Sequence, residues 1–340
     1  NNLKQKKTKI GILGGTFDPA HRGHLEISKQ AKKILELKNI IWAITKQNPF
    51  KNTSKTDLKS RIKFAKKFIG KNINEFMWDA NPAIWANHAP NLFPIIGALK
   101  EDSYRFENKK YTMTKHGFIR NNKDIAIHEK TNDSLTFKLS QNESTLKSYP
   151  FKFEFYITYK LTDNKIDIIH TVKNCDEQRL YFSLGGHPAF KCPVYNDENY
   201  DDYFLEFEHI ENSVRHLINM ETGLISSKTK PVFNNSNKIP LTHDLFNEDA
   251  LIFKDLKSRK VTLKSDTYGA ILSVNFKEFP YLGIWAKPNG NYVCIEPWLG
   301  IADHEDTNQE LKTKEGILSL EANKSFTASY TIEIHNNHLV

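Results

Sequence analysis

A histidine and a glutamate that lie far apart in the sequence have the side chains for acid–base chemistry. His187 follows a strand-like run and two glycines in Ser-Leu-Gly-Gly-His-Pro-Ala-Phe, residues 183–190. The glycines allow a sharp turn and clear side chains from the space around the imidazole, which suits a histidine that points into a cavity. A tight turn capped by a structural histidine is the alternative. An imidazole exchanges its proton near neutral pH, so its use depends on the partners that the rest of the chain supplies.

Glu296 is the candidate partner, and it lies in Tyr-Val-Cys-Ile-Glu-Pro-Trp, residues 292–298. Strand alternation places its side chain on the same face as Trp298. The run at 283–287 is expected to pair with this strand and to bring Trp285 beside it. A carboxylate among aromatic side chains has a raised pKa and suits a general base. An exposed strand glutamate is the alternative.

A third stretch, residues 115–120, combines His116, a glycine and Arg120 in one loop. A loop histidine and a surface charge are the alternatives. The three stretches would converge on a cavity, although the sequence by itself leaves their pairing open. Aromatic walls with a few polar groups are how proteins hold sugars. Trp78 and Trp85 are expected in the core instead.

Near the start of the chain, a different pattern is typical of phosphate binding. Gly-Gly-Thr-Phe-Asp-Pro-Ala-His-Arg-Gly-His spans residues 14–24 between a strand and a helix. Gly14 and Gly15 allow a phosphate to approach the backbone, and the helix N-terminus supplies amide donors. His21 and His24, three residues apart, can face the same phosphate and stabilise its charge.

The elements around this pattern form a βαβ unit. Strands are predicted at 9–13 and 40–44, with a helix at 25–37 between them, and the strands are expected to be parallel. A further helix is predicted at 57–69, with apolar residues on one face. Helical periodicity and lysine density then fade, and we place the boundary at 73–76.

The sequence therefore predicts two domains, an α/β segment over 1–75 and a mainly β domain over 76–340. After the boundary, short alternating runs are separated by turn signals, and no amphipathic helix of ordinary length intervenes. This pattern predicts a large antiparallel sandwich. The predicted strands are 111–113, 135–139, 151–161, 165–172, 179–184, 204–207, 250–253, 261–264, 270–275, 281–287, 292–297 and 325–334.

Composition narrows the classes of protein that this chain can be. With 340 residues, 39% of them hydrophobic, it can build a sizeable core. The net charge of +8 is concentrated in lysines near the start, but no basic run with interleaved aromatics indicates a nucleic-acid partner. Three widely spaced cysteines fit neither a disulfide framework nor a zinc site and indicate a reducing cytoplasm. No apolar run is long enough to span a bilayer, so no membrane association is expected.

The string at 14–24 resembles the nucleotidyltransferase superfamily, and within it bacterial nicotinate-nucleotide adenylyltransferases. Thr-Lys-Gln-Asn-Pro-Phe-Lys at 45–51 is similar to that family's substrate loop. The resemblance covers 8–71, about the first third of such an enzyme. The family's second nucleotide motif is missing, so we expect residual nucleotide binding at most. The resemblance implies these nucleotide-binding residues: Gly14, Gly15, Thr16, Phe17, His21, His24 and Lys51.

The second domain resembles aldose 1-epimerases, most of all the branch of LacX-type galactose mutarotase-related proteins, over about 76–334. The family normally begins some tens of residues earlier, so the chain looks like a fusion of two truncated genes. The resemblance implies a galactose mutarotase-like β-supersandwich with Glu296 as general base, His187 as general acid, His116 as second active-site histidine and Arg120 as substrate contact. Trp285 and Trp298 complete the predicted substrate site. The resemblance to aldose 1-epimerases is carried by residues 87–94, 97, 116–120, 186–190, 283–285 and 294–298.

The function expected from this resemblance is interconversion of the α and β anomers of an aldohexose, without a metal or cofactor. Arg120 and Lys287 leave a phosphorylated aldose open as substrate. Three alternatives remain. The junction near Ile73 would be an artefact, and the protein would not fold as one unit. The first segment would otherwise transfer adenylyl groups, which the missing motif argues against. The second domain would otherwise be a non-catalytic carbohydrate-binding module, which the Glu and His set argues against.

Overall fold

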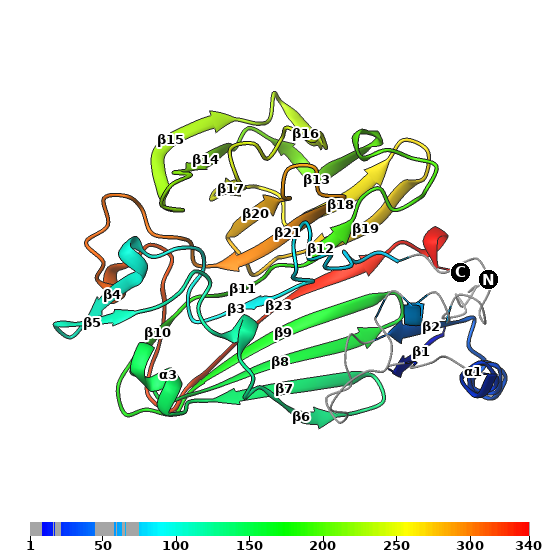
Figure 1. Cartoon of the computed structure of the whole chain (residues 1–340), viewed down its shortest axis with the longest axis horizontal. Coiled ribbons are helices and arrows are strands. Elements are labelled where there is room, and N and C mark those ends of the chain that lie inside the picture. The colour runs from blue at the N-terminus through cyan, green and yellow to red at the C-terminus, as the bar shows by residue number, and fades with distance from the viewer. Residues whose placement is uncertain are drawn as a thin grey trace, which may run out of the picture. The chain divides into compact units, whose positions relative to one another are not determined.

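The computed structural model describes residues 9–15, 17, 22–44, 58, 60–62, 65 and 75–339 (Figure 1). It divides into two compact units, one of Asn1–Asn74 with His335–Val340 and one of Glu75–Ile334. We call the first the N-terminal unit and the second the β unit. None of the helices in the described part of the chain has the length and apolar character needed to cross a lipid bilayer.

The N-terminal unit contains a βαβ arrangement. Strand β1 (Ile10–Gly15) pairs in parallel with β2 (Asn39–Ile44), and helix α1 (Arg22–Ile34) connects them. The predicted parallel pair is confirmed, and the helix begins and ends three residues earlier than predicted. The predicted helix at 57–69 lies largely outside the described residues, but residues 58, 60–62 and 65 are helical.

The small core of this unit is built around Trp42. Its indole stacks on Phe17, with 4.8 Å between ring centroids, and its Nε1–H donates to Ser28 Oγ at 2.7 Å. Two strands and one helix cover little apolar surface, so Ile12 and Ile34 stay exposed. This is the uncovered surface expected of a short parallel sheet.

The β unit contains two large antiparallel sheets. The nine-stranded sheet has the order β16-β13-β18-β19-β23-β9-β8-β7-β6, and several of its strands run side by side in Figure 1. In chain order its strands are β6 (Ala126–Lys130), β7 (Ser134–Ser140), β8 (Phe153–Thr162), β9 (Lys165–Asn174), β13 (Tyr203–Glu211), β16 (Ser236–Pro240), β18 (Lys260–Ser265), β19 (Gly269–Asn275) and β23 (Ser325–Ile334).

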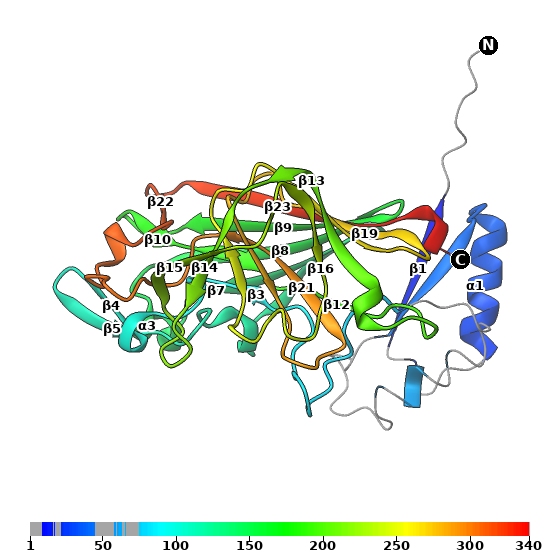
Figure 2. The ribbon, with the colours of Figure 1, turned by 90° about the horizontal axis from the view of Figure 1, so that it is seen from above.

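The eight-stranded sheet carries the candidate site. Its order is β15-β14-β17-β20-β21-β11-β3, and β12 also pairs with β21. Figure 2 shows β21 and β3 crossing over strands of the other sheet. Its strands are β3 (Asn91–Leu92), β11 (Leu184–Gly186), β12 (Ala189–Lys191), β14 (Val214–Ile218), β15 (Ile225–Pro231), β17 (Leu251–Phe253), β20 (Tyr281–Trp285) and β21 (Tyr292–Leu299).

Smaller elements close the ends of the sandwich. Two-stranded sheets join β4 (Ser103–Phe106) to β5 (Lys109–Thr112) and β10 (Leu180–Phe182) to β22 (Leu318–Leu320). The short helices of the β unit are α3 (Glu143–Ser148), η1 (Lys100–Asp102), η2 (Ile119–Asn121), η3 (Tyr200–Asp202) and η4 (Leu311–Thr313). Helix η5 (Asn336–His338) belongs to the N-terminal unit.

A continuous apolar core lies between the two large sheets. It takes side chains from both, such as Phe155 of β8 and Ile295 of β21. Phe93, next to β3, stacks on Phe155 with 4.3 Å between ring centroids. The prediction of a mainly β, antiparallel sandwich is confirmed.

The glycines before His187 do not make the sharp turn that the sequence predicted. Gly185 and Gly186 lie in β11, and neither has a positive φ. A Cβ at Gly185 would lie 2.7 Å from the Pro297 carbonyl oxygen, and one at Gly186 would overlap the Tyr330 hydroxyl. The glycines therefore serve close packing. The predicted strand at 179–184 is also divided, because β10 and β11 belong to different sheets.

We predict that Gly186→Ala lowers the free energy of unfolding by ~1–3 kcal/mol, because the new methyl group overpacks a filled core. Urea or thermal unfolding of the full chain measures this. Tyr330→Leu removes the facing ring and completes a double-mutant cycle. The losses of unfolding free energy of the two single variants should sum to more than the loss of the double variant. Additive costs would contradict the close-packing role.

Candidate active site

One cavity in the β unit gathers all six residues predicted for the sugar site. It has a volume of about 180 Å³ and lies on the eight-stranded sheet. The six residues belong to β20, β21, the residue after β11, the loop that leads into η2, and η2 itself. They are His116, Arg120, His187, Trp285, Glu296 and Trp298.

Glu296 lies in the middle of β21, where every residue is buried. Its carboxyl Oε1 is 3.2 Å from Nε2 of His187. Gly283 of β20 is its register partner, and a side chain there would overlap the Trp298 indole. The glycine therefore lets the indole lie across the strand pair, next to the carboxylate. Trp285 pairs in register with Cys294 rather than with Glu296, yet it lines the same cavity.

His187 is held by its backbone and by aromatic rings. Its N–H donates to the Pro90 carbonyl at 3.0 Å. The Trp85 ring stacks on the imidazole with centroids 5.0 Å apart, and Trp285 meets it edge-on at 5.8 Å. These contacts limit the imidazole to orientations in which Nε2 faces Glu296.

His116 lies on a tightly pinned loop. Its φ is +67° and that of Gly117 is +70°, and a Cβ at Gly117 would overlap the Phe93 carbonyl. Only glycine suits the second position without strain. The His116 N–H donates to the Gly97 carbonyl at 2.9 Å, and the Gly97 N–H donates to His116 Nδ1 at 3.1 Å. Since Nδ1 accepts, the ring proton is on Nε2, which is left to act as a donor.

Burial dominates the electrostatics of the pair. Burial raises the pKa of Glu296 well above its ordinary value. The positive charge of Lys115 opposes this rise, and the negative charge of Asp249 adds to it. Burial lowers the pKa of His187 to about 3, and the charges of Lys115 and Arg120 add to that. Burial and the neighbouring His187 likewise hold the pKa of His116 well below its ordinary value. Burial therefore favours the neutral form of the pair, with a carboxylic acid and a neutral imidazole, over the charged form.

One group of side chains in the described part of the chain has the spacing of a metal site. The ligand atoms of His187, Cys294 and Glu296 lie within 4.8 Å of one another. Burial raises the pKa of the Cys294 thiol well above its ordinary value, and metals bind the thiolate. The residues therefore favour acid–base work over metal binding.

The structure adds residues that the sequence analysis missed or misplaced. Trp85 was expected in the core, but it lines the cavity and covers His187. Lys115 and Asp249 also line it. The position of Lys115 beside His116 was the available signal, whereas nothing local marked Asp249. Lys287 was considered for substrate binding, but its Nζ donates to the Ile84 carbonyl and it is not among the lining residues.

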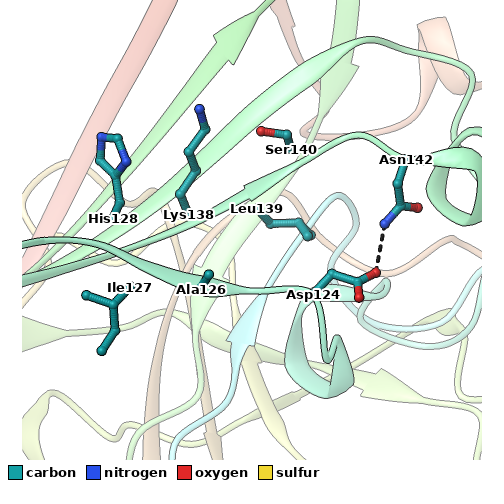
Figure 3. Close-up of a pocket in the computed structure, with 8 residues that line it drawn as sticks. All are labelled: Asp124, Ala126, Ile127, His128, Lys138, Leu139, Ser140 and Asn142. Atoms are coloured by element: carbon teal, nitrogen blue, oxygen red, sulfur yellow. Dashed lines mark hydrogen bonds between the residues drawn. The ribbon is translucent and has the colours of Figure 1, made fainter. Parts of the chain in front are cut away.

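A second cavity lies along β6 and β7 and measures about 440 Å³ (Figure 3). Among the residues drawn, one hydrogen bond is marked, from Asn142 Nδ2 to Asp124 Oδ2 at 2.8 Å. Its side chains are spread along the two strands without an acid–base contact. The chemistry thus favours the smaller cavity as the active site.

The residues predicted to bind a nucleotide are only partly described. Gly14 and Gly15 end β1, and a Cβ at Gly14 would have no heavy atom within 4 Å. Phe17 is buried, with its ring 4.7 Å from that of His24. Three others lie outside the described residues: Thr16, His21 and Lys51. Nucleotide binding stays a prediction.

Comparison with known proteins gives two families. Residues 66–318 match the model of aldose 1-epimerase, and residues 12–105 match a cytidylyltransferase-like model. Protein LacX of Lactococcus lactis is 33% identical over 270 residues, which is 77% of this chain and 90% of LacX. A probable nicotinate-nucleotide adenylyltransferase of Pelagibacter ubique is 94% identical over 72 residues, which is 21% of this chain and 40% of that protein.

Solved structures resemble the β unit. A galactose mutarotase related enzyme from Lactobacillus acidophilus has 38% identity and a TM-score of 0.73, and the match covers 77% of this chain and 88% of that one. A galactose mutarotase-like protein from Lactobacillus casei has 32% identity and a TM-score of 0.70, with 77% and 90% covered. Both predicted resemblances and the galactose mutarotase-like fold are confirmed.

We predict that His116 is a neutral imidazole with its proton on Nε2 at pH 6. Nitrogen-15 chemical shifts of the histidine rings should show an acceptor-type Nδ1 and a protonated Nε2 that do not titrate between pH 5 and 8. A His116→Gln variant assigns the signals. An imidazolium that titrates near the ordinary value of 6.5 would contradict the bond from Gly97.

Proposed function

The chain belongs to the aldose 1-epimerase family, and from that premise we propose that its β unit interconverts the α and β anomers of an aldohexose. One observation carries the proposal. A buried carboxyl and a buried imidazole touch at 3.2 Å inside a cavity with aromatic walls. Such a pair can protonate one oxygen of a hemiacetal carbon while it removes the proton from that carbon's other oxygen.

The reaction begins with the charged form of the pair. Transfer of the shared proton across the contact gives a Glu296 carboxylate and a His187 imidazolium. The carboxylate takes the proton of the anomeric hydroxyl as the imidazolium protonates the ring oxygen. The C1–ring oxygen bond breaks and C1 becomes an aldehyde carbon. After rotation about C1–C2, His187 takes back the proton of the C5 hydroxyl as it attacks, and Glu296 returns its proton to the C1 oxygen.

The proton count of the pair stays at one throughout this cycle. The charged pair exists before ring opening and the neutral pair after it, so neither form should be strongly preferred. Burial favours the neutral form, while stacking of Trp85 on the imidazole favours its charged form through the ring's negative face. General acid–base catalysis of this kind contributes roughly 10²–10⁴-fold for each group.

The remaining lining residues supply contacts for the sugar. Trp85 and Trp285, with ring centroids 5.4 Å apart and nearly perpendicular, form an apolar corner that suits the C–H face of a pyranose. His116 Nε2–H and Arg120 offer donors to hydroxyl oxygens, and Asp249 offers an acceptor. The cysteines carry free thiols, which fits our proposal of the reducing cytoplasm as the place of action.

Two other functions are weaker. A carbohydrate-binding module would need the aromatic corner and hydrogen-bonding groups, but it would have no use for a buried acid–base contact that costs free energy of folding. Adenylyl transfer by the N-terminal unit would need more of the enzyme than is present, because the match spans 40% of the adenylyltransferase from Pelagibacter ubique.

We predict that Glu296→Gln lowers kcat for anomer exchange of glucose or galactose by at least a hundredfold, because the amide cannot accept the anomeric proton. Exchange spectroscopy by NMR measures the rate, corrected for the buffer reaction. The isosteric change should leave the protein folded by circular dichroism. Glu177→Gln, at an exposed position, is the matched control and should keep the wild-type rate. Wild-type exchange by Glu296→Gln would refute the assignment.

The activity should keep a broad plateau through neutral pH. The pair works with one proton, and a second proton must enter on His187, whose pKa is lowered to about 3. The acid limb of kcat/KM should therefore lie well below the ordinary histidine value. The alkaline limb reports loss of the proton held by Glu296, whose raised pKa delays that loss. An acid limb centred near 6.5 would show that His187 titrates like an exposed histidine.

A further inference from the structure

Two cations line the active-site cavity without a partner. Lys115 and Arg120 come from the pinned loop around His116, and neither has a hydrogen bond or ion pair to any residue that the structure describes. Lys115 is exposed and Arg120 is half-buried, whereas the other buried or half-buried cations of the β unit have hydrogen-bond or ion-pair partners. Lys314 contacts Asp303 at 2.7 Å, and Lys254 contacts Glu315 at 2.8 Å. Among the half-buried cations, the lack of a partner therefore sets Arg120 apart, and Lys115 adds a second charge at the same cavity.

The position of Arg120 makes its unpaired state costly. Its guanidinium is partly buried, and that burial lowers its pKa. A guanidinium withdrawn from water loses hydration and regains it only from an anion or several acceptors. Asp249 also lines the cavity, but its Oδ1 accepts the N–H of Ala250. None of the described residues pairs with the Arg120 side chain, so an anionic group on a bound molecule would supply an acceptor that the protein itself does not.

The backbone of the loop that carries both cations is fixed. Its backbone is tied to Gly97 by His116, and the N–H groups of Phe118 and Ile119 both donate to the Phe93 carbonyl. Phe93 is itself buried in the aromatic core. Such a loop loses little conformational entropy when a ligand binds, which strengthens recognition by the charges that it carries.

We propose that the preferred substrate is an anionic aldose, whose phosphate or carboxylate group is bound by Lys115 and Arg120. This inference rests on the proposed function and names its substrate class. Ring opening requires a free hydroxyl at C1, so the anionic group must be on another carbon. A guanidinium can bind two oxygens of a phosphate or carboxylate at once, and the lysine adds a point charge. Repulsion from Asp249 orients the anionic end toward the two cations.

The test compares three sugars in anomer exchange, each corrected for its own buffer rate. Glucose 6-phosphate, glucuronate and glucose share a pyranose ring and differ at C6. We expect kcat/KM for one of the anionic sugars to exceed that for glucose by at least tenfold. Arg120→Gln and Lys115→Gln should each raise KM for that anionic sugar by about tenfold or more. Lys123→Gln, which removes the same charge from an exposed residue of the following loop outside the cavity lining, should leave it unchanged.

The outcomes separate two claims, that the substrate is anionic and that the protein is an epimerase. A preference for glucose 6-phosphate identifies the anion as a phosphate ester, and one for glucuronate identifies it as a carboxylate. Equal kcat/KM for all three sugars would overturn the anionic substrate and leave the epimerase proposal standing.

If no sugar shows accelerated exchange, the proposed function fails, and calorimetry decides the anion site separately. Binding of glucose 6-phosphate or glucuronate that is tighter than that of glucose, and is lost in Arg120→Gln, would support the site. Equal binding would overturn it.

Discussion

The contact between the Glu296 carboxyl and the His187 imidazole sets the requirements that the rest of the β unit meets. Two ionisable groups withdrawn from water are tolerated only when they are paired or neutral. In the proposed mechanism a single proton serves both groups, and burial raises the pKa of Glu296 while it lowers that of His187. The pair can therefore alternate between neutral and charged forms without exchanging a proton with solvent. That property is what opening and closing a hemiacetal ring requires.

Rigid strands place the proposed acid and base, and a pinned loop places groups that we propose recognise the ligand. Glu296 is in the centre of a strand that is buried along its whole length, and His187 follows directly on a strand paired to it. The close packing of these strands against neighbouring aromatic rings depends on glycines, because side chains at Gly186 and Gly283 would overlap Tyr330 and Trp298. His116 and the two cations come from a loop that is tied to the core through Phe93. This division keeps the acid and base within hydrogen-bonding distance while the substrate contacts can vary.

Local patterns in the sequence predicted the parts of this site that depend on local structure. Alternation along the strand indicated that Glu296 and Trp298 share a face, because the period of a strand is a property of the backbone itself. The role of the glycines before His187 was wrongly predicted as a turn. A glycine can serve positive φ or close packing, and only the three-dimensional neighbours distinguish these uses. The short strands β3 and β12 were missed, since each is stabilised by a partner far away in the chain. Trp85 and Asp249 meet the other lining residues only in the folded β unit, so no nearby residue marked them.

The most direct test is exchange spectroscopy by NMR on the wild-type protein at neutral pH, with glucose and galactose at anomeric equilibrium. We expect cross peaks between the α and β H1 signals whose intensity grows with protein concentration, in buffer containing a metal chelator. Exchange at the buffer rate by a folded protein, with these sugars and with their C6-charged analogues, would contradict the claim that the buried pair is a working acid and base.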